Sequence, residues 1–107
     1  MRDEVAMLLG RWRTDPDDQW SLKEFGEVSL EFLVDGRLLY VVALPKKQQS
    51  MHLVYSVEGG CLVTDQPSHP RVQRTPFFFT PDGRLALENP PPSPPTFHVR
   101  LHDSPAS

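Results

Sequence analysis

Residues 27–44 read Glu-Val-Ser-Leu-Glu-Phe-Leu-Val-Asp-Gly-Arg-Leu-Leu-Tyr-Val-Val-Ala-Leu, two strand-like runs on either side of Asp35-Gly36. An Asp-Gly pair readily takes the positive φ angles of a two-residue type I′ turn, so this stretch predicts a β-hairpin. Before the turn, one face collects the apolar side chains Val28, Leu30, Phe32 and Val34. Such a period of two indicates a strand with one buried face and one wet face.

Similar short alternating segments recur along the chain, at residues 10–13, 51–57, 61–65, 71–80, 84–88 and 96–101. Tight turns are predicted at Gly59-Gly60 and at Pro81-Asp82-Gly83. Pro76 lies inside a predicted strand and cannot donate to a ladder, which implies an edge position or a bulge.

The remaining segments connect these strands. Residues 3–9 predict a short helix that Gly10 ends. Residues 14–26 predict a long polar loop, packed back onto the body through its apolar residues Trp20, Leu22 and Phe25. Residues 45–50 predict a loop, and the proline-rich residues 89–95 predict an extended connector before the last strand.

About eight strands joined mainly by short turns favour an antiparallel up-and-down meander. Closure into a small barrel would remove the two open edges that a meander leaves. We therefore expect an all-β barrel with a short N-terminal helix, formed as a single domain by residues 1–107, with a β-sandwich as the second choice.

Composition excludes several classes of partner. The net charge is −3, and 23% of the residues are charged without a basic cluster, which argues against nucleic-acid binding. No apolar run approaches the roughly 20 residues of a membrane span. The N-terminus lacks the pattern of a signal peptide, and Cys61 is the only cysteine, so we expect a cytoplasmic protein.

The chain begins with a helical turn, Gly10-x-Trp12 opens the first strand, and a long first connection follows. This order of elements resembles the lipocalin-like (calycin) barrels. The resemblance implies a barrel in which an Arg or Lys of the last strand packs across the Trp. Arg100 matches that role, and alternation places it on the face opposite Phe97, Val99 and Leu101. Residues 10–40 also resemble small bacterial proteins of this kind, a likeness that implies no activity.

Catalytic and metal-binding patterns are weak. There is no Gly-x-Ser-x-Gly nucleophile motif, and Cys61 follows two glycines rather than opening a helix. Four histidines are scattered along the chain: His52, His69, His98 and His102. Only His98 and His102 are closely spaced, and His52 and His98 could meet across strands. Asp15, Asp17 and Asp18 fit turns and helix caps better than a calcium loop. We expect no enzyme activity, no cofactor and no metal.

Two hypotheses about function follow. In the first, the barrel binds a small hydrophobic ligand in its interior, and Trp12 with Arg100 closes one end. The cavity-lining residues would be Trp12, Leu30, Phe32, Tyr40, Leu53, Tyr55, Phe78 and Leu87. In the alternative, the core is filled, and the chain is an interaction or structural module. The continuous apolar runs at residues 38–44 and 77–79 would then leave an outer apolar stripe that forms a homodimer.

Overall fold

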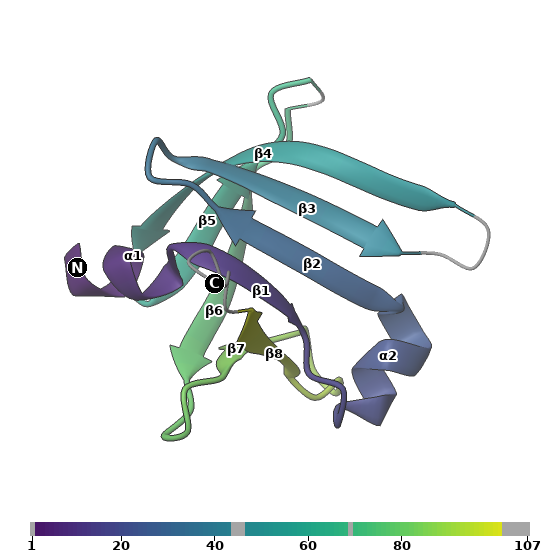
Figure 1. Cartoon of the computed structure of the whole chain (residues 1–107). Helices are drawn as coiled ribbons and strands as arrows, with labels where there is room; N and C mark the ends of the chain where they lie inside the picture. The colour runs from purple at the N-terminus through teal and green to yellow at the C-terminus, as the bar shows by residue number, and fades with distance from the viewer. Residues whose placement is uncertain (1, 44–46, 69, 102–107) are drawn as a thin grey trace, which may run out of the picture.

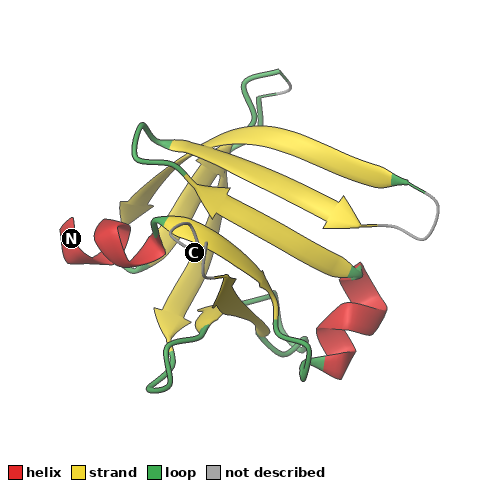
Figure 2. Ribbon diagram, in the orientation of Figure 1, coloured by secondary structure: helices red, strands yellow, loops and turns green. Residues whose placement is uncertain are grey.

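A computed structural model describes residues 2–43, 47–68 and 70–101. Over these residues it contains two short helices and eight strands (Figure 1, Figure 2). In chain order they are α1 (Arg2–Leu8), β1 (Gly10–Thr14), α2 (Gln19–Phe25), β2 (Glu27–Phe32), β3 (Arg37–Ala43), β4 (Gln48–Glu58), β5 (Cys61–Asp65), β6 (Gln73–Phe79), β7 (Leu85–Leu87) and β8 (Thr96–Leu101).

Each strand pairs antiparallel with the next one, and β8 pairs with β1 to close the barrel. The closing register places Trp12 opposite Arg100 and Thr14 opposite His98. The predicted all-β meander barrel with a short N-terminal helix is therefore confirmed. Because β1 runs from α1 toward α2, the two helices lie at opposite ends of the barrel (Figure 1).

The β2–β3 hairpin forms, but the predicted two-residue type I′ turn is wrong. The Leu33 N–H donates to the Arg37 carbonyl at 2.8 Å, and the Gly36 N–H donates to the Leu33 carbonyl at 3.1 Å, so the loop holds three residues. Only Gly36 within it has a positive φ, at 89°, which fits a type I turn followed by a left-handed glycine. Val34 consequently sits in the loop and is 88% exposed, not on the inner face as predicted.

The same hairpin is built a second time between β6 and β7. The Thr80 N–H donates to the Arg84 carbonyl at 2.8 Å, and the Gly83 N–H donates to the Thr80 carbonyl at 2.9 Å. The two loops share the pattern Phe-x-x-Asp-Gly-Arg-Leu, at residues 32–38 and 79–85. Both patterns place a phenylalanine before the loop and a buried leucine after it on the inner face of the barrel.

The first connection folds differently from the predicted loop, because part of it forms α2. Asp18 caps this helix: its carboxylate accepts hydrogen bonds from the Ser21 N–H at 3.2 Å and the Ser21 hydroxyl at 2.7 Å. Gly26, with a φ of 76°, ends it. The loop predicted for residues 45–50 is wrong for residues 48–50, since β4 begins at Gln48, and residues 45 and 46 lie outside the described ranges.

Pro76 lies within β6, in a closed barrel, where an edge position was predicted. Its carbonyl accepts the Glu88 N–H at 2.9 Å, so its nitrogen faces the same side. The adjoining strand β7 ends at Leu87. The absent N–H therefore falls where the neighbouring strand has already stopped, which makes this position a local edge.

Aromatic rings fill the end of the barrel next to α1. This aromatic layer consists of Trp12, Phe32, Tyr55, Phe77 and Phe79. Ring centroids lie 6.1 Å apart in the Trp12–Phe79 pair and 5.0 Å apart in the Phe32–Tyr55 pair. Leu8 of α1 is fully buried in the same cluster, so the helix caps this end.

The last strand ties α1 to the aromatic layer. The Arg100 guanidinium carbon lies 4.2 Å from the Trp12 ring centroid, and the Arg100 side chain donates hydrogen bonds to the carbonyls of Met7 and Leu9. The Trp12 indole N–H donates to the Leu8 carbonyl at 2.9 Å. These bonds satisfy carbonyl groups that the end of a helix leaves unpaired.

Phe32→Ala should lower the free energy of unfolding by about 3–5 kcal/mol, because it opens a cavity in the aromatic layer. Val34→Ala, two residues away in the exposed loop, should change it by less than about 0.5 kcal/mol. Urea denaturation followed by tryptophan fluorescence measures both. Equal effects of the two substitutions would contradict this assignment of Phe32 to the core.

Candidate ligand-binding cavity

The half of the barrel next to α2 is hollow. It encloses a cavity of about 700 Å³ that is open to solvent. One side of it, the apolar wall, is formed by β2, β3 and β4. Its residues are Val28, Leu30, Leu38, Tyr40, Met51 and Leu53. The strand registers place Leu30, Tyr40 and Met51 side by side, and Leu38 beside Leu53, so the apolar wall is continuous.

The opposite side, the polar wall, comes from β5, β6 and β8. Its residues are Thr64, Gln73, Thr75, Thr96 and His98. These side chains are smaller than the aromatic rings at the other end, and this difference in volume explains why one half of the barrel is filled and the other is not.

The rim of the cavity combines apolar and charged groups. Phe25 of α2 and the prolines Pro90 and Pro91 border it, as do Arg71 and Arg74. Arg74 pairs with Glu58 at 3.3 Å, a contact that is exposed and therefore weak.

His98 is the one ionisable side chain of the polar wall, and it is 2% exposed. Burial lowers its pKa to about 4, although a hydrogen bond with the Leu85 backbone and the nearby charge of Asp18 act in the opposite direction. The imidazole is therefore neutral at pH 7. Its Nδ1 atom has no hydrogen-bond partner within the described part of the chain.

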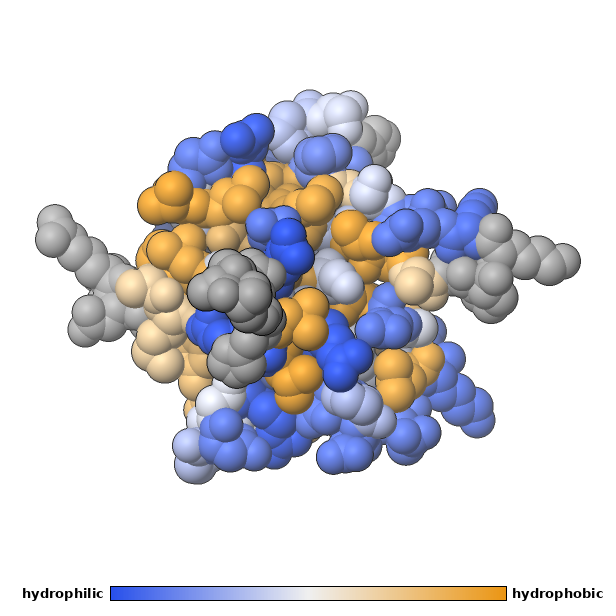
Figure 3. All heavy atoms as spheres, in the orientation of Figure 1, coloured by the Kyte–Doolittle hydropathy of each residue, from blue (hydrophilic) through white to orange (hydrophobic). Residues whose placement is uncertain are grey.

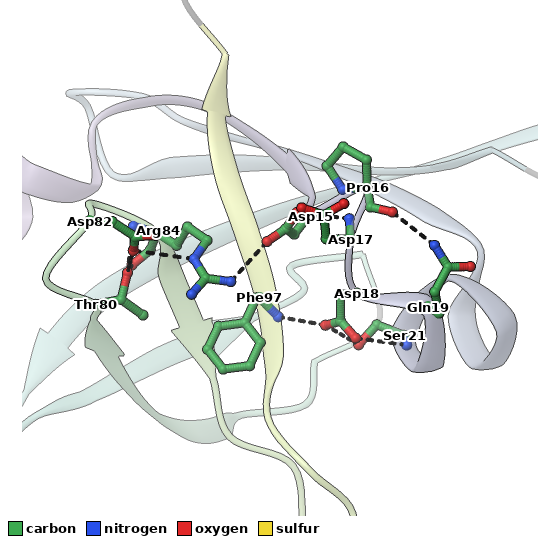
Figure 4. A network of polar contacts seen from close by, with 10 residues as sticks. All are labelled: Asp15, Pro16, Asp17, Asp18, Gln19, Ser21, Thr80, Asp82, Arg84 and Phe97. Carbon is green, nitrogen blue, oxygen red and sulfur yellow. Dashed lines mark hydrogen bonds and ion pairs between the residues drawn. The ribbon is translucent and has the colours of Figure 1, made fainter.

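A network of aspartates fixes α2 and the first connection to β8 (Figure 4). Asp15 is nearly buried; its carboxylate accepts a hydrogen bond from Arg84 at 3.0 Å and its backbone N–H donates to the Phe97 carbonyl at 2.8 Å. Asp18 accepts the Phe97 N–H at 3.0 Å. Burial alone would raise the pKa of Asp18, but the hydrogen bonds from Phe97 and Ser21 lower it overall. These bonds hold Phe25 at the rim of the cavity.

Four of the predicted lining residues lie at the cavity: Leu30, Tyr40, Leu53 and Leu87. Burial raises the pKa of Tyr40, so its phenol stays neutral there. Trp12, Phe32 and Tyr55 belong instead to the aromatic layer, on the filled side of the barrel. The predicted closing pair, Trp12 and Arg100, lies at that filled end.

The prediction for Phe78 is wrong. Phe77 and Phe79 pair with Leu87 and Leu85 on the inner face, and alternation then turns Phe78 outward, where it is 42% exposed. In a run of three phenylalanines the pattern itself does not distinguish the two faces. The barrel register decides between them.

His98 and Thr96 were not predicted to line the cavity. A signal for them existed, because alternation along the last strand gives His98 the same face as Arg100. Once Arg100 is placed against Trp12 in the interior, His98 and Thr96 must point inward as well. His52 lies on the outer face of β4 and is exposed, whereas His98 points inward. The two histidines therefore do not meet across strands.

Within residues 2–43, 47–68 and 70–101, no group of three potential ligands is placed to hold a metal ion. Of the other histidines that the sequence singled out, His69 and His102 lie outside these ranges. No helix among the described residues is long and apolar enough to cross a bilayer.

Stability should fall as the pH drops from 7.5 to 5, by about 2 kcal/mol from His98 alone. The unfolded chain binds a proton on this residue near pH 6.5, whereas the folded chain resists protonation until about pH 4. Urea midpoints of wild type and His98→Gln across this range measure the effect, and His98→Gln should show the flatter profile. His52→Gln, which alters an exposed histidine, should keep the wild-type slope; a His98→Gln profile as steep as wild type would contradict the assignment.

The chain was compared with known proteins at the levels of sequence family, individual sequence and structure. No family model, curated protein or solved structure matches it. The cavity and the residues that line it are therefore the main indication of its function.

Proposed function

We propose that this protein is a non-enzymatic small β-barrel protein that binds a small hydrophobic ligand in its interior. The observation that carries the proposal is the cavity of about 700 Å³ beside α2. Small-molecule sites typically occupy about 300–1,000 Å³, with mainly apolar walls and a few polar groups. The apolar wall and the polar wall divide the cavity in this way.

The binding energy would come from the apolar wall. Each methylene group transferred from water onto such a surface contributes about 0.8 kcal/mol. The aromatic layer prevents the ligand from passing through the barrel, so the cavity is a dead end entered beside α2. The polar wall would orient the ligand without supplying most of the affinity.

The proposal includes a lipocalin-like identity. Three features support it: an N-terminal helix, Gly10-x-Trp12 at the start of β1, and the stacking of Arg100 from the last strand on Trp12. The eight-stranded meander has the strand order that this resemblance implies.

Leu53→Trp should weaken the binding of an environment-sensitive apolar dye by at least about tenfold, because the larger side chain would occupy the cavity. Val54→Trp is the matched control: Val54 is the next residue of β4, points outward, and is 41% exposed. Fluorescence titration gives the affinities, and displacement of the dye by fatty acids tests whether the same space is used. Unchanged affinity in Leu53→Trp would contradict the proposal.

We also propose, as the second candidate, self-association through the outer apolar stripe, whose exposed ring, Phe78, lies on β6 and whose other part lies on the non-adjacent strand β3. Phe78 is exposed beside Ala86, which pairs in turn with Phe97. On the outer face of β3, Leu39 and Val41 are half-buried among polar neighbours such as Glu31 and His52. Figure 3 shows this mixture over the outer face of the sheet, with hydrophobic residues gathered between hydrophilic ones.

If the stripe forms a homodimer, the mass measured by light scattering should rise from one chain at high dilution to two chains at tens of micromolar. Phe78→Ser should keep the chain monomeric throughout, since it removes the exposed ring. Val34→Ser, which alters an exposed loop residue, should leave the wild-type behaviour. A single-chain mass of the wild type at every concentration would exclude the homodimer.

A further inference from the structure

The start of β4 has a neighbouring strand on one side only. β3 pairs with residues 48–54 of β4, whereas pairing with β5 begins at Val54. Figure 1 shows this part of β4 as the upper margin of the sheet that it forms with β3 and β2. Within the described part of the chain, residues 48–53 therefore have a free strand edge, called the free edge below.

The backbone groups that point out from the free edge belong to the even-numbered residues. The Tyr55 N–H donates to the Gly36 carbonyl on the β3 side at 2.9 Å, and backbone groups alternate in direction along a strand. Gln48, Ser50 and His52 therefore direct their N–H and C=O groups away from β3. None of these groups is hydrogen-bonded to another residue that the structure describes.

The free edge lacks the features that usually keep strand edges apart. Natural edge strands carry charged residues, prolines or bulges, which prevent pairing with another chain. Residues 48–53 read Gln-Gln-Ser-Met-His-Leu, without an acidic residue, a lysine, an arginine or a proline. Such an edge can accept a further strand.

The cavity opens beside this edge. Met51 and Leu53 of β4 line it on one side, and Gln66 and Arg71, from the segment after β5, line it on another. Met51 faces the interior opposite Tyr40 and yet is 37% exposed, so the cavity is open to solvent at this point. A strand added to the free edge would lie along this opening, and every second side chain of that strand would point into the cavity.

We propose that the free edge binds an extended peptide, antiparallel to β4, whose alternate apolar side chains enter the cavity. Strand addition of this kind takes its affinity from backbone hydrogen bonds and its specificity from pockets for alternate side chains. The antiparallel direction is the one in which β4 pairs with both β3 and β5. The inference goes beyond the proposed function, because the partner is recognised by its backbone as well as by its hydrophobic groups.

Positive charge around the opening favours acidic residues at the ends of the peptide. Lys47 is exposed and precedes the free edge, and Arg71 borders the cavity on the other side. Among the described residues Arg71 has no ion-pair partner, whereas Arg74 is paired with Glu58. Glu88, an acidic residue at the cavity border, follows β7. Complementary charge of this kind steers a partner toward its site.

The probe is the peptide Glu-Thr-Leu-Thr-Leu-Thr-Glu, acetylated and amidated at its ends. In the proposed pairing its threonines bond to the free edge and face outward, as Ser50 does, while its leucines point into the cavity. N-methylation of the central threonine should lower the affinity measured by calorimetry at least about tenfold, because it removes a hydrogen bond and places a methyl group against β4.

N-methylation of the leucine beside that threonine is the matched control. The leucine nitrogen faces away from β4, so the affinity should stay within about twofold of the parent peptide. Equal losses from both methylations would overturn the inference. The absence of binding of the parent peptide at millimolar concentration would overturn it as well.

Two substitutions at one position of β4 repeat the test on the protein. Ser50→Pro removes an N–H that points out from the free edge and that no bond to β3 uses, and should lower the affinity for the peptide at least about tenfold. Ser50→Val keeps this N–H and should bind the peptide as the wild type does. Wild-type affinity in a folded Ser50→Pro would contradict the inference.

Hydrogen exchange in the wild-type protein covers the case in which Ser50→Pro does not fold. The peptide should slow exchange of the Gln48, Ser50 and His52 amides at least about tenfold, and should leave the Gln49 and Met51 amides, which face β3, unchanged. Slowing confined to other strands would overturn the inference. So would slowing of the same three amides without peptide in a sample whose scattering mass is two chains, since a second copy would then occupy the edge.

Failure of this inference and failure of the proposed function give different results. If the apolar dye binds and the peptide does not, the inference fails and the binding of a small hydrophobic ligand stands. If the peptide binds with the expected alternation and the dye does not, the inference stands and the small-ligand function fails. If neither binds, both fail.

Discussion

Closure of the barrel between β1 and β8 is the constraint on which the rest of the molecule depends. The two strands come from opposite ends of the chain, and their register sets Trp12 against Arg100. The guanidinium stacks on the indole and also binds the carbonyls at the end of α1. The Arg100 side chain thus links α1, β1 and β8, so the contacts that close the barrel also fill its end.

That closure also determines where empty space can exist. The aromatic layer takes up the volume near α1, whereas the strands near α2 present one aromatic ring, that of Tyr40, among threonines, leucines and other smaller side chains. Close packing cannot be achieved there without larger side chains. Asp15 and Asp18 both bond to the Phe97 backbone of β8 and hold α2 at this end, and no helix or strand of the described residues fills the space beneath it.

Much of the fold could be predicted because each strand carries its own short-range signal. The alternation of Val28, Leu30 and Phe32 and the glycine turns establish a meander without knowledge of its partners. The turn type at Gly36, the outward direction of Phe78 and the helix at residues 19–25 could not be obtained this way. They depend on strand register and on the Asp18 cap, which also accepts a hydrogen bond from Phe97 of the distant last strand. The cavity was harder still to predict, because an inward-facing side chain does not reveal whether it contacts the side chains on the opposite side of the barrel.

The short strand β7 affects the shape of the cavity opening, which the number of strands alone does not reveal. It spans three residues, against eleven in β4, and the proline-rich segment that follows it forms part of the cavity wall. Leu87, Glu88, Asn89 and Pro90 all border the hollow half. The entrance of the cavity is therefore bordered by a connecting segment rather than by hydrogen-bonded strands. Insertions or deletions there could resize the portal while every strand pairing of the barrel stays in place.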